Sequence, residues 1–479
     1  MLKIQITVSL TDDEYTGEEK EIQVQIEESL PDGFRDLDNW EADVRRIGFQ
    51  AMREVYRRGI ELYEKKLLSE YTHKGKECQM QNRGKRGFTL ATIFGKVTFP
   101  RQRVHCKTCK QWLIPLNEAL GLHDEEKERT TLALQQLASL YAIDQPYRLA
   151  EKAVKDITQD TEVISHQQIK LIVDQEGYML RQHEEQKRKD ISYGVIREIV
   201  DELRVPQSRS PTRSAGCSDK RSGQFYICLD GIYTRSHKGK GHWHEGKVGF
   251  LCTDERASVG KKGRLRITNK RYISSYENSA IFGSRAYAEA VNMGMRDYVE
   301  VILLGDGARW IREVRIQCFP FAMYVLDWYH FHRKVCRAFR YTFPKDKTLR
   351  RKLRRPITTQ LWKGQKEEAL KHLEELYIQL LSEGKQDLLE KREGMKELIE
   401  YIQNNWEGIV NYGQMQKDGY LIASTLVEGA ANLVVAKRQK KKHGMHWSRN
   451  GADNLYALRT LWLNGDWEKY WKQQCRKAA

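Results

Sequence analysis

Two short apolar runs that end in aspartate and glycine constrain the fold more than any other feature of the chain. The segment "FYICLDG" ends at Asp230 and Gly231, and in "VILLGDG" Asp306 stands between two glycines. Apolar runs of this length that are bounded by glycine predict buried strands. Because open α/β sheets bind their ligands at the carboxyl ends of strands, both aspartates are candidate site residues of an α/β domain.

Both aspartates suit divalent cations. Converging carboxylates can hold two Mg²⁺ ions about 3.5–4 Å apart, one activating an attacking oxygen and the other stabilising the leaving oxygen of a phosphodiester. Asp-Gly at a strand end is also an ordinary turn signal, and Asp254 and Asp327 are competing acids. In "LDWYH", Asp327 and His330 are accessory candidates, with a buried, hydrogen-bonded histidine as the alternative.

The charge of the chain predicts a polyanionic partner. The formal net charge of the 479 residues is +17, and clustered Lys and Arg displace counterions from phosphate backbones, so DNA is the first candidate. No apolar run approaches the ~20 residues that cross a bilayer, and the segment "MLKIQITVSLTDDEY" lacks the order of a secretory signal. We therefore expect a soluble, cytoplasmic protein with no membrane partner.

A third acid, Glu428, lies on a helical pattern near the end of the chain. In "LVEGAANLVVAKRQKKKHGMHWSRN" the apolar residues recur at helical spacing, and Glu428 falls on an adjoining polar stripe. The candidates for DNA contact that follow it are Lys437, Arg438, Lys440, Lys441, Lys442, Trp447 and Arg449. The cations would grip phosphates and Trp447 would stack on an unpaired base. The alternatives are a solvated basic face for the run and a core anchor for Trp447.

The cysteine pattern predicts reduced thiols and one candidate metal site. The chain has nine cysteines and a single C-x-x-C. Thiolates and imidazole suit Zn²⁺, and the proposed tetrahedral ligands are His73, Cys78, Cys106 and Cys109. His105 is a competing ligand. The alternative is a degenerate module that its hairpin core holds together without metal.

Composition and periodicity divide the chain into seven segments. The N-terminal half contains strands and a helix (1–70), a small β module with the C-x-x-C (71–124), a helical region (125–185) and a linker (186–222). The C-terminal half contains the first part of an α/β core (223–332), a helical block (333–420) and further helices (421–479). In the helical region Ser165 is an expected N-cap, and the pattern fits a helix-turn-helix DNA reader or an ordinary three-helix unit. A second basic patch, Arg333 to Arg355, would add phosphate contacts.

The ordered set "LDGIYT", "LGDGARWI", "LDWYHFHRKV" and "LVEGAANLVVAKRQKKKHGMHWSRNGADNLYALR" resembles bacterial insertion-sequence transposases with a DDE active site. The nearest group is the Kra-type, with a more distant likeness to Lre-type and Mutator-like elements. The resemblance extends from about Cys78 to Trp467. It implies an RNase H-like catalytic core whose second and third acids are separated by an all-helical insertion.

By motif, the resemblance implies that Asp230, Asp306 and Glu428 are the catalytic ligands of Mg²⁺ or Mn²⁺. It matches Asp327 and His330 to the D-x-x-H feature of Mutator-like relatives. The helical block fits between Asp306 and Glu428, which are 122 residues apart (428 − 306).

The implied function is a DNA transposase that is nucleoid-associated in the bacterial cytoplasm. It would bind terminal inverted repeats through residues 71–182, cleave a strand with activated water and join the freed 3′-hydroxyl to target DNA. The resemblance also implies a homodimer or higher oligomer. The alternatives are a catalytically silent DNA-binding protein derived from a transposase, a metal-dependent nuclease without strand transfer, and a zinc-dependent RNA-binding or scaffold protein.

Overall fold

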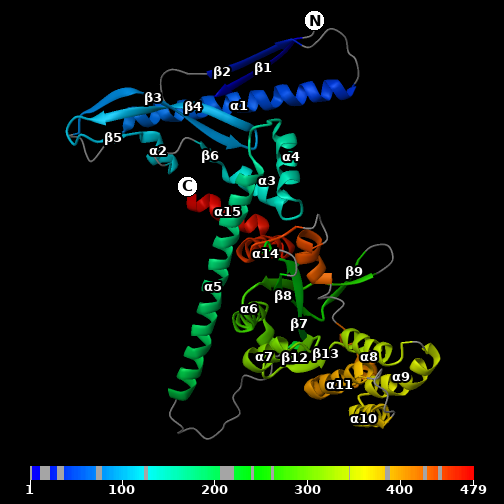
Figure 1. Cartoon of the computed structure of the whole chain (residues 1–479). Coiled ribbons are helices and arrows are strands. Elements are labelled where there is room, and N and C mark those ends of the chain that lie inside the picture. The colour runs from blue at the N-terminus through cyan, green and yellow to red at the C-terminus, as the bar shows by residue number, and fades with distance from the viewer. Residues whose placement is uncertain are drawn as a thin grey trace. The chain divides into compact units, whose positions relative to one another are not determined.

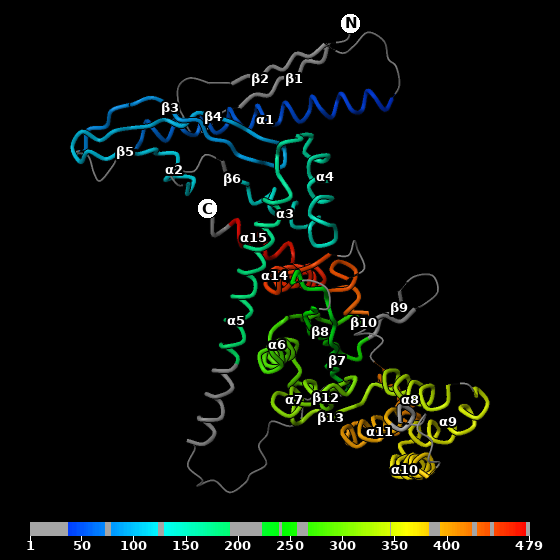
Figure 2. Tube along the Cα trace, in the orientation of Figure 1, coloured from blue at the N-terminus to red at the C-terminus, as the bar shows by residue number. Residues whose placement is uncertain are grey.

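The chain forms two compact units in a computed structural model (Figure 1, Figure 2). One unit comprises Met1–Val173 and Asp466–Ala479, and the other comprises Asp174–Gly465. The structure describes residues 3–10, 22–29, 37–71, 78–122, 128–204, 221–238, 242–259, 264–344, 346–382, 389–423, 429–440 and 445–478. No helix in these ranges is long and apolar enough to cross a membrane.

The first unit contains a hairpin, a long helix and a four-stranded sheet. The hairpin pairs β1 (Lys3–Leu10) with β2 (Ile22–Ser29), and α1 spans Leu37–Glu70. The sheet has the order β5-β4-β3-β6, and its strands are β3 (Met80–Thr92), β4 (Gly95–Cys106), β5 (Trp112–Leu113) and β6 (Glu128–Thr130). Ile60 and Leu67 of α1 pack on a core of Phe88, Leu90, Val97, Phe99 and Leu116. The long helix and the hairpin before the C-x-x-C are thus confirmed.

Helices complete the first unit. They are α2 (Pro115–Leu120), α3 (Leu132–Ala142), α4 (Tyr147–Thr158), the beginning of α5 (His166–Arg204) and α15 (Trp467–Ala478). Ser165 caps α5 as predicted, because its Oγ accepts from the Gln168 amide at 3.2 Å and its own amide donates to Gln168 Oε1 at 2.8 Å. The carboxylate of Asp160 fastens the helices to the hairpin by accepting from the Lys96 amide at 2.7 Å.

The length of α5 differs from the sequence prediction. The linker expected at 186–222 begins inside this helix, which continues to Arg204. The segment is polar and charged, and that composition suggested a linker, but it does not prevent a helix. The rest of the expected linker, residues 205–220, lies outside the described residues.

A five-stranded sheet forms the centre of the second unit. Its order is β11-β8-β7-β12-β13, from β7 (Arg221–Arg235), β8 (Trp243–Thr253), β11 (Lys270–Ser275), β12 (Tyr298–Gly305) and β13 (Met323–Leu326). β8 runs antiparallel to both of its neighbours, whereas β7, β12 and β13 are parallel. β7 and β12 contain the two apolar runs that the sequence predicted as buried strands. A two-stranded hairpin, β9 (Arg256–Val259) and β10 (Arg264–Ile267), was not predicted.

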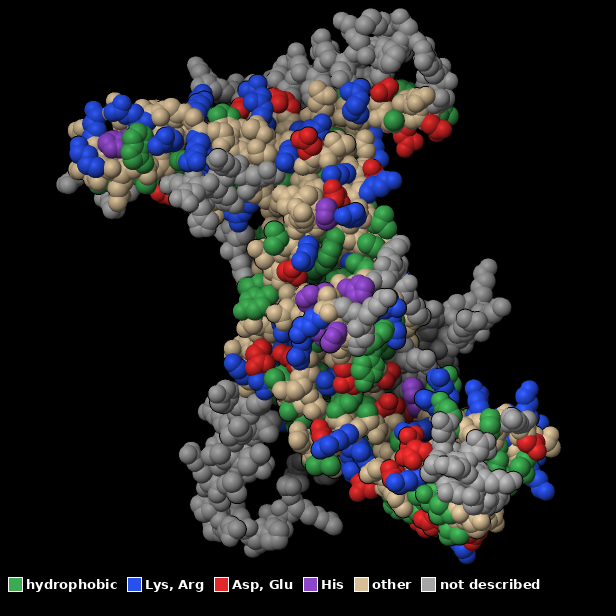
Figure 3. Space-filling view, in the orientation of Figure 1, with side chains coloured by type: hydrophobic (Ala, Val, Ile, Leu, Met, Phe, Trp, Pro, Cys, Tyr) green, Lys and Arg blue, Asp and Glu red, His purple; other side chains and the backbone are tan. Residues whose placement is uncertain are grey.

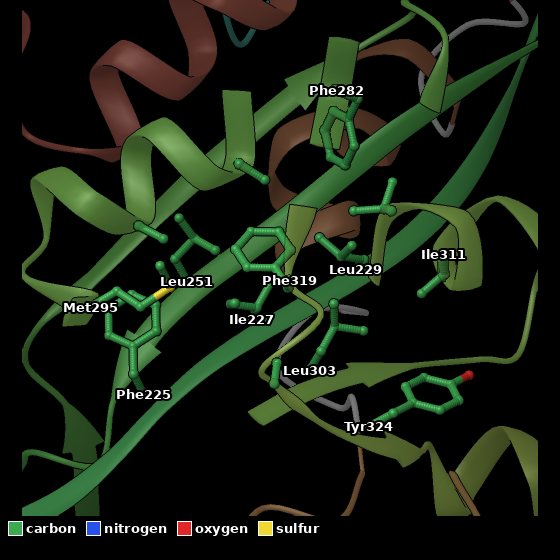
Figure 4. Close-up of a cluster of buried hydrophobic side chains, with 14 of the residues drawn as sticks. Phe225, Ile227, Leu229, Leu251, Phe282, Met295, Leu303, Ile311, Phe319 and Tyr324 are labelled. Atoms are coloured by element: carbon green, nitrogen blue, oxygen red, sulfur yellow. The ribbon is translucent and has the colours of Figure 1, made fainter. Parts of the chain in front are cut away.

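Two helices, α6 (Ser279–Asn292) and α7 (Arg309–Cys318), cover one face of this sheet. Figure 4 shows Phe225, Ile227 and Leu229, alternate residues of β7, pointing into a core shared with Phe282 of α6 and Ile311 of α7. Full burial of each such side chain stabilises the fold by about 1.5–3 kcal/mol. Because side chains alternate along a strand, Tyr226, Cys228 and Asp230 belong to the opposite face.

The opposite face is covered by chain from near the C-terminus. The π-helix η4 (Asn432–Lys440) contacts β7, and α14 (Arg449–Leu463) contacts β11. The ring of Tyr456 in α14 stacks on Tyr276 with centroids 4.7 Å apart. In the apolar helical pattern around residues 430–434, Ala430, Ala431 and Val434 are buried.

A helical block lies in the chain between β13 and η4. It contains α8 (Trp328–Thr342), α9 (Lys347–Trp362), α10 (Lys366–Ser382), α11 (Leu389–Asn404) and α12 (Tyr412–Lys417), which Figure 2 shows gathered beside β13. The Trp328 ring lies 4.9 Å from that of Trp362 and 4.8 Å from that of Tyr412. This aromatic cluster joins the first helix of the block to α9 and α12. The predicted helical block is confirmed, and it begins five residues earlier than expected.

Candidate active site

Three aspartates lie in one row at the carboxyl ends of the parallel strands. The register pairs Leu229 with Gly305 and Gly305 with Leu326, and each of these residues is followed by an aspartate. The row is therefore Asp230, Asp306 and Asp327. The amide of Asp327 donates to the Gly305 carbonyl at 2.8 Å and extends the strand pairing to the row itself. Two of these acids were predicted as site residues and the third as an accessory.

The backbone around Asp306 is held tightly. Gly307 has φ +85°, and a Cβ there would lie 2.8 Å from Asn405 Oδ1, so this position requires glycine. The Asp306 side chain accepts from the Ala308 amide at 2.9 Å, and its carbonyl accepts from the Tyr401 hydroxyl at 2.6 Å. Burial raises the pKa of Tyr401, so the hydroxyl stays protonated and continues to donate. α11 thereby fixes the position of an acid on the sheet.

The three carboxyl groups interact electrostatically. Burial, and next the charge of Asp306, raise the pKa of Asp230 from its ordinary value of 3.8 to about 6. Asp327 acts in the same direction, whereas His330 and the amide of Gly231, which donates to Asp230 at 2.8 Å, oppose the rise. The row therefore concentrates negative charge that a cation would relieve.

Asp327 and His330 are joined through the first turn of α8. Asp327 is fully buried and caps the helix, because its Oδ1 accepts from the His330 amide at 3.0 Å. The imidazole Nε2 of His330 is buried, and within the described part of the chain it has no hydrogen-bond partner. Since an unpaired buried polar atom costs about 1–3 kcal/mol, a ligand that satisfied Nε2 would bind with that advantage.

A basic cavity of about 950 Å³ begins at His330 and follows α8 and α11. Its cationic lining residues are Arg333, Lys334, Arg337 and Arg340, and its acidic lining residues are Glu393 and Glu397. The guanidinium of Arg337 lies over the exposed ring of Tyr341, 5.5 Å from its centroid. The cavity thus offers cations and an aromatic face directly beside the carboxylate row.

Asp254, a competing acid, lies at the other end of the sheet. β8 runs antiparallel to β7, so Asp254 follows β8 beside the beginning of β7, where its amide donates to the Gln224 carbonyl at 3.1 Å. A Cβ on Gly223 would lie 2.9 Å from Asp254 Oδ1. Asp254 therefore does not belong to the row.

Several predicted site residues lie outside the described residues: His73, Glu428, Lys441 and Lys442. The third-acid prediction for Glu428 consequently stays a prediction. Of the remaining cationic candidates, Lys437 and Lys440 are exposed on η4. Arg449 is also exposed, and it donates a hydrogen bond to the Tyr276 carbonyl.

Arg438 and Trp447 are placed differently from the sequence expectation. Arg438 is fully buried, with its guanidinium 5.0 Å from the Trp447 ring centroid and 3.0 Å from Met445 Sδ. Trp447 is 6% exposed, and its amide donates to the Arg235 carbonyl at the end of β7 at 3.0 Å. Both side chains are inaccessible to DNA in this arrangement. This geometry corrects the expected DNA contacts and favours the alternative of a core anchor for Trp447.

Three of the four predicted zinc ligands come together in the first unit. The Sγ atoms of Cys78, Cys106 and Cys109 all lie within 4.8 Å of one another. Hydrogen bonding from the Cys109 amide is the largest cause that lowers the pKa of Cys106, to about 7. His105, the competing ligand, instead packs its ring against Trp112 with centroids 4.8 Å apart.

Sequence reasoning missed Tyr401 and the link between α8 and α11. Tyr401 follows Asp306 by 95 residues and has no motif around it. Its contact with Asp306 depends on how the helical block folds back to the sheet. Helical periodicity predicts that α11 is a helix, but it does not predict which elements α11 packs against.

A comparison with known proteins gives the family of the chain. One family model, described as "Uncharacterised protein family (UPF0236)", matches residues 32–194 and 187–474. The chain belongs to this family. The assignment to the Kra-type insertion-sequence transposases is therefore wrong, because the family model and the relatives named below carry UPF0236 names.

Relatives of the UPF0236 chain include proteins of Streptococcus gallolyticus and Caldanaerobacter subterraneus. A Streptococcus gallolyticus protein, "UPF0236 protein in vanSb 3'region", is 22% identical over 445 residues, which cover 91% of this chain and 85% of the relative. A Caldanaerobacter subterraneus UPF0236 protein is 28% identical over 214 residues, which cover 43% of this chain and 41% of the relative. The name of this second protein joins eleven locus designations. Another protein from the same organism is 31% identical over 166 residues, 35% of this chain and 32% of the relative.

Proposed function

We propose that this UPF0236 chain is a DNA transposase, an enzyme that cuts and joins DNA strands with the help of divalent cations. The observation that carries the proposal is the row of Asp230, Asp306 and Asp327 beside the unpaired Nε2 of His330 and the basic cavity. The proposal rests on this geometry and does not depend on the rejected Kra-type assignment.

The row has the chemistry of a site for Mg²⁺ or Mn²⁺. Carboxylate oxygens are the preferred ligands of these hard cations, and burial together with the charge of Asp306 raises the pKa of Asp230, a cost that bound positive charge would relieve. Asp230 and Asp306 would hold the cations, with Glu428 as the third ligand that the sequence suggests. When bound, they would supply activation of an attacking oxygen and stabilisation of a leaving oxygen.

The protein's own groups have separate tasks in this proposal. Tyr401 holds the main chain at Asp306 and so keeps its carboxylate in place. Asp327 holds the first turn of α8 and thereby orients His330. The Nε2 of His330 would exchange a hydrogen bond with a phosphate oxygen of the substrate. Arg333, Arg337 and the other cations of the cavity would bind the strand that leaves the row.

The sheet supports an RNase H-like core as part of the proposal. Such a core has a five-stranded sheet in which one strand is reversed, and the order β11-β8-β7-β12-β13 with β8 reversed agrees with this. The helical block stands in the chain after β13 and before the residues near Glu428, where an all-helical insertion is expected.

The charge of the chain and the names of its relatives also support the proposal. A formal net charge of +17 suits binding to DNA in the bacterial cytoplasm. One protein name with eleven locus designations, in the Caldanaerobacter relative, is what a gene that multiplies within a genome produces. In the proposal, α3, α4 and the beginning of α5 read the ends of the element, and two chains act together to join them.

The test is cleavage and strand transfer on DNA that carries the sequences flanking the gene, with Mg²⁺ or Mn²⁺. Wild type should nick at the element ends and join the 3′ ends to a second DNA. Asp306→Asn and Glu428→Gln should still bind the DNA but cut at least about 100-fold more slowly. Asp254→Asn is the matched control, because this acid lies at the other end of the sheet, and it should cut normally.

The other outcomes separate the alternatives. Nicking without joining would identify a metal-dependent nuclease. DNA binding without cleavage by any version would identify a silent DNA-binding protein. Normal cutting by Asp306→Asn would overturn the proposed site.

A further inference from the structure

Three cysteines converge at the open end of the β3–β4 hairpin, in the first unit. Cys78 lies two residues before the start of β3, Cys106 is the last residue of β4, and Cys109 lies in the turn that follows. Their Sγ atoms lie within 4.8 Å of one another, although Cys78 and Cys106 are 28 residues apart in the chain (106 − 78). This cluster belongs to a different unit from the carboxylate row and has no part in the proposed chemistry.

The turn after Cys106 has the shape of a metal-binding turn. The Cys109 amide points at Cys106 Sγ, 3.5 Å away, and the Lys110 amide donates to the Cys106 carbonyl at 2.9 Å. Lys110 has φ +60° and is one of two non-glycine residues with positive φ in the described part of the chain. A lysine in this conformation is costly, so the turn is held by its surroundings.

The two residues before β3, Cys78 and Gln79, are tied to the same turn. The Lys107 amide donates to the Gln79 carbonyl at 2.8 Å, and the Gln79 amide donates to Thr108 Oγ1 at 3.3 Å. These two bonds bring Cys78 to the turn without any metal. The three thiols are therefore preorganised by the backbone, which lowers the cost of binding an ion.

The spacing of the sulfur atoms fits a tetrahedral metal better than a disulfide. Zn–S bonds of about 2.3 Å in a tetrahedron place neighbouring sulfurs about 3.8 Å apart, which the limit of 4.8 Å on the distances within this cluster accommodates. A disulfide joins only two cysteines at about 2.05 Å and would leave the third unused. Soft thiolates in this number favour Zn²⁺ over hard cations such as Mg²⁺.

His105 is not part of the cluster. It precedes Cys106 in β4, so its side chain belongs to the other face of the strand. There its ring packs against Trp112, and the guanidinium of Arg103 lies 4.4 Å from the Trp112 ring centroid.

We propose that Cys78, Cys106 and Cys109 bind one Zn²⁺ ion through three thiolates, with the fourth position filled by a non-cysteine ligand. The ion would clasp the open end of the hairpin, opposite its Thr92–Gly95 turn, and fix the strand that carries Arg103 and His105.

The clasped end of the sheet is strongly basic. Between Gln79 and Asn117 the chain has no Asp or Glu, and its exposed cations toward this end are Arg83, Lys85, Lys107 and Lys110, with Arg86 and Arg103 half-buried. Figure 3 shows Lys and Arg side chains gathered at the end of the sheet near β5, around a histidine. Loss of the clasp should therefore loosen this basic surface as well as the fold.

The test is the metal content of the full-length chain, purified from cells grown with zinc and dialysed against metal-free buffer. Elemental analysis should find about one zinc per wild-type chain. Cys106→Ser and Cys78→Ser should each lose most of it, whereas Cys475→Ser, which changes an exposed cysteine elsewhere, should keep it. Zinc-free wild type, iron in place of zinc, or equal loss in Cys475→Ser would overturn the proposal.

A second measurement guards against variants that fail to fold. Wild-type protein loaded with Co²⁺ should show the near-ultraviolet charge-transfer absorption of thiolate ligands, with an intensity that corresponds to three. Titration of wild type with a mercurial should release zinc as three thiols react. A Co²⁺-loaded protein without a thiolate absorption band would contradict the proposed zinc site. Zinc release that does not follow the modification of thiols would also contradict it. Neither readout requires DNA cleavage, so failure of the zinc site and failure of the proposed function remain distinguishable.

Discussion

Asp230→Asn should stabilise the metal-free protein at alkaline pH. In the folded chain the pKa of Asp230 is about 6 rather than 3.8, because burial and the charge of Asp306 disfavour its ionised form. A group whose folded pKa is raised contributes stability that is complete below its unfolded pKa and is lost as pH rises through the folded pKa. The difference of about two pKa units means that ionisation of Asp230 lowers the free energy of unfolding by about 3 kcal/mol at pH 8. At pH 4 the same effect is less than about 1 kcal/mol.

The asparagine removes this charge and can still accept the hydrogen bond from the Gly231 amide. The free energy of unfolding should therefore rise by up to about 3 kcal/mol at pH 8 and change little at pH 4. The assay measures hydrogen exchange of peptides from β7 in the full-length chain at increasing urea concentration, with EDTA present. The free energy of unfolding obtained in this way is compared between variant and wild type at each pH. A variant that is less stable at pH 8, or that gains equally at both pH values, would refute this reasoning.

Three further predictions concern the surroundings of the row and the fold of its unit. Tyr401→Phe removes the hydrogen-bond donor to the Asp306 carbonyl, so it should lower the free energy of unfolding by about 1 kcal/mol. It should also slow DNA cleavage without weakening DNA binding, and an unchanged cleavage rate would contradict the positioning role of Tyr401. Gly177→Ala places a Cβ against the Asn454 carbonyl and should cost about 2–3 kcal/mol, measured by urea unfolding; an unchanged midpoint would contradict the packing of α5 on α14. Arg337→Ala should reduce the slope of log affinity for DNA against log salt by about 1, and an unchanged slope would place the DNA elsewhere.

The strand ends were predictable because the signal for a buried strand is local. Asp230 and Asp306 each follow an uninterrupted apolar run, and glycine beside them marks the end of the strand. An apolar run does not indicate whether its strand runs parallel or antiparallel to its neighbours. Asp254 follows an equally good run, and only the antiparallel course of β8 puts it at the other end of the sheet.

The cationic run near Glu428 shows where sequence reasoning fails. Charge alone predicted that Arg438 faces solvent, but the segment with Trp447 joins the end of β7 and encloses the guanidinium. The contact of Tyr401 with Asp306 likewise depends on a long-range fold that periodicity does not contain. Side chains whose environment comes from distant parts of the chain were misplaced or missed.

The central claim is that the aspartate row binds divalent cations, and direct titration with Mn²⁺ measures this. Electron paramagnetic resonance of free Mn²⁺, at pH 8 and without DNA, gives the number of ions bound and their affinity. We expect wild type and the Asp254→Asn control to bind alike, and Asp230→Asn and Asp306→Asn to bind at least about tenfold more weakly. Equal Mn²⁺ binding by Asp306→Asn and wild type would contradict the account.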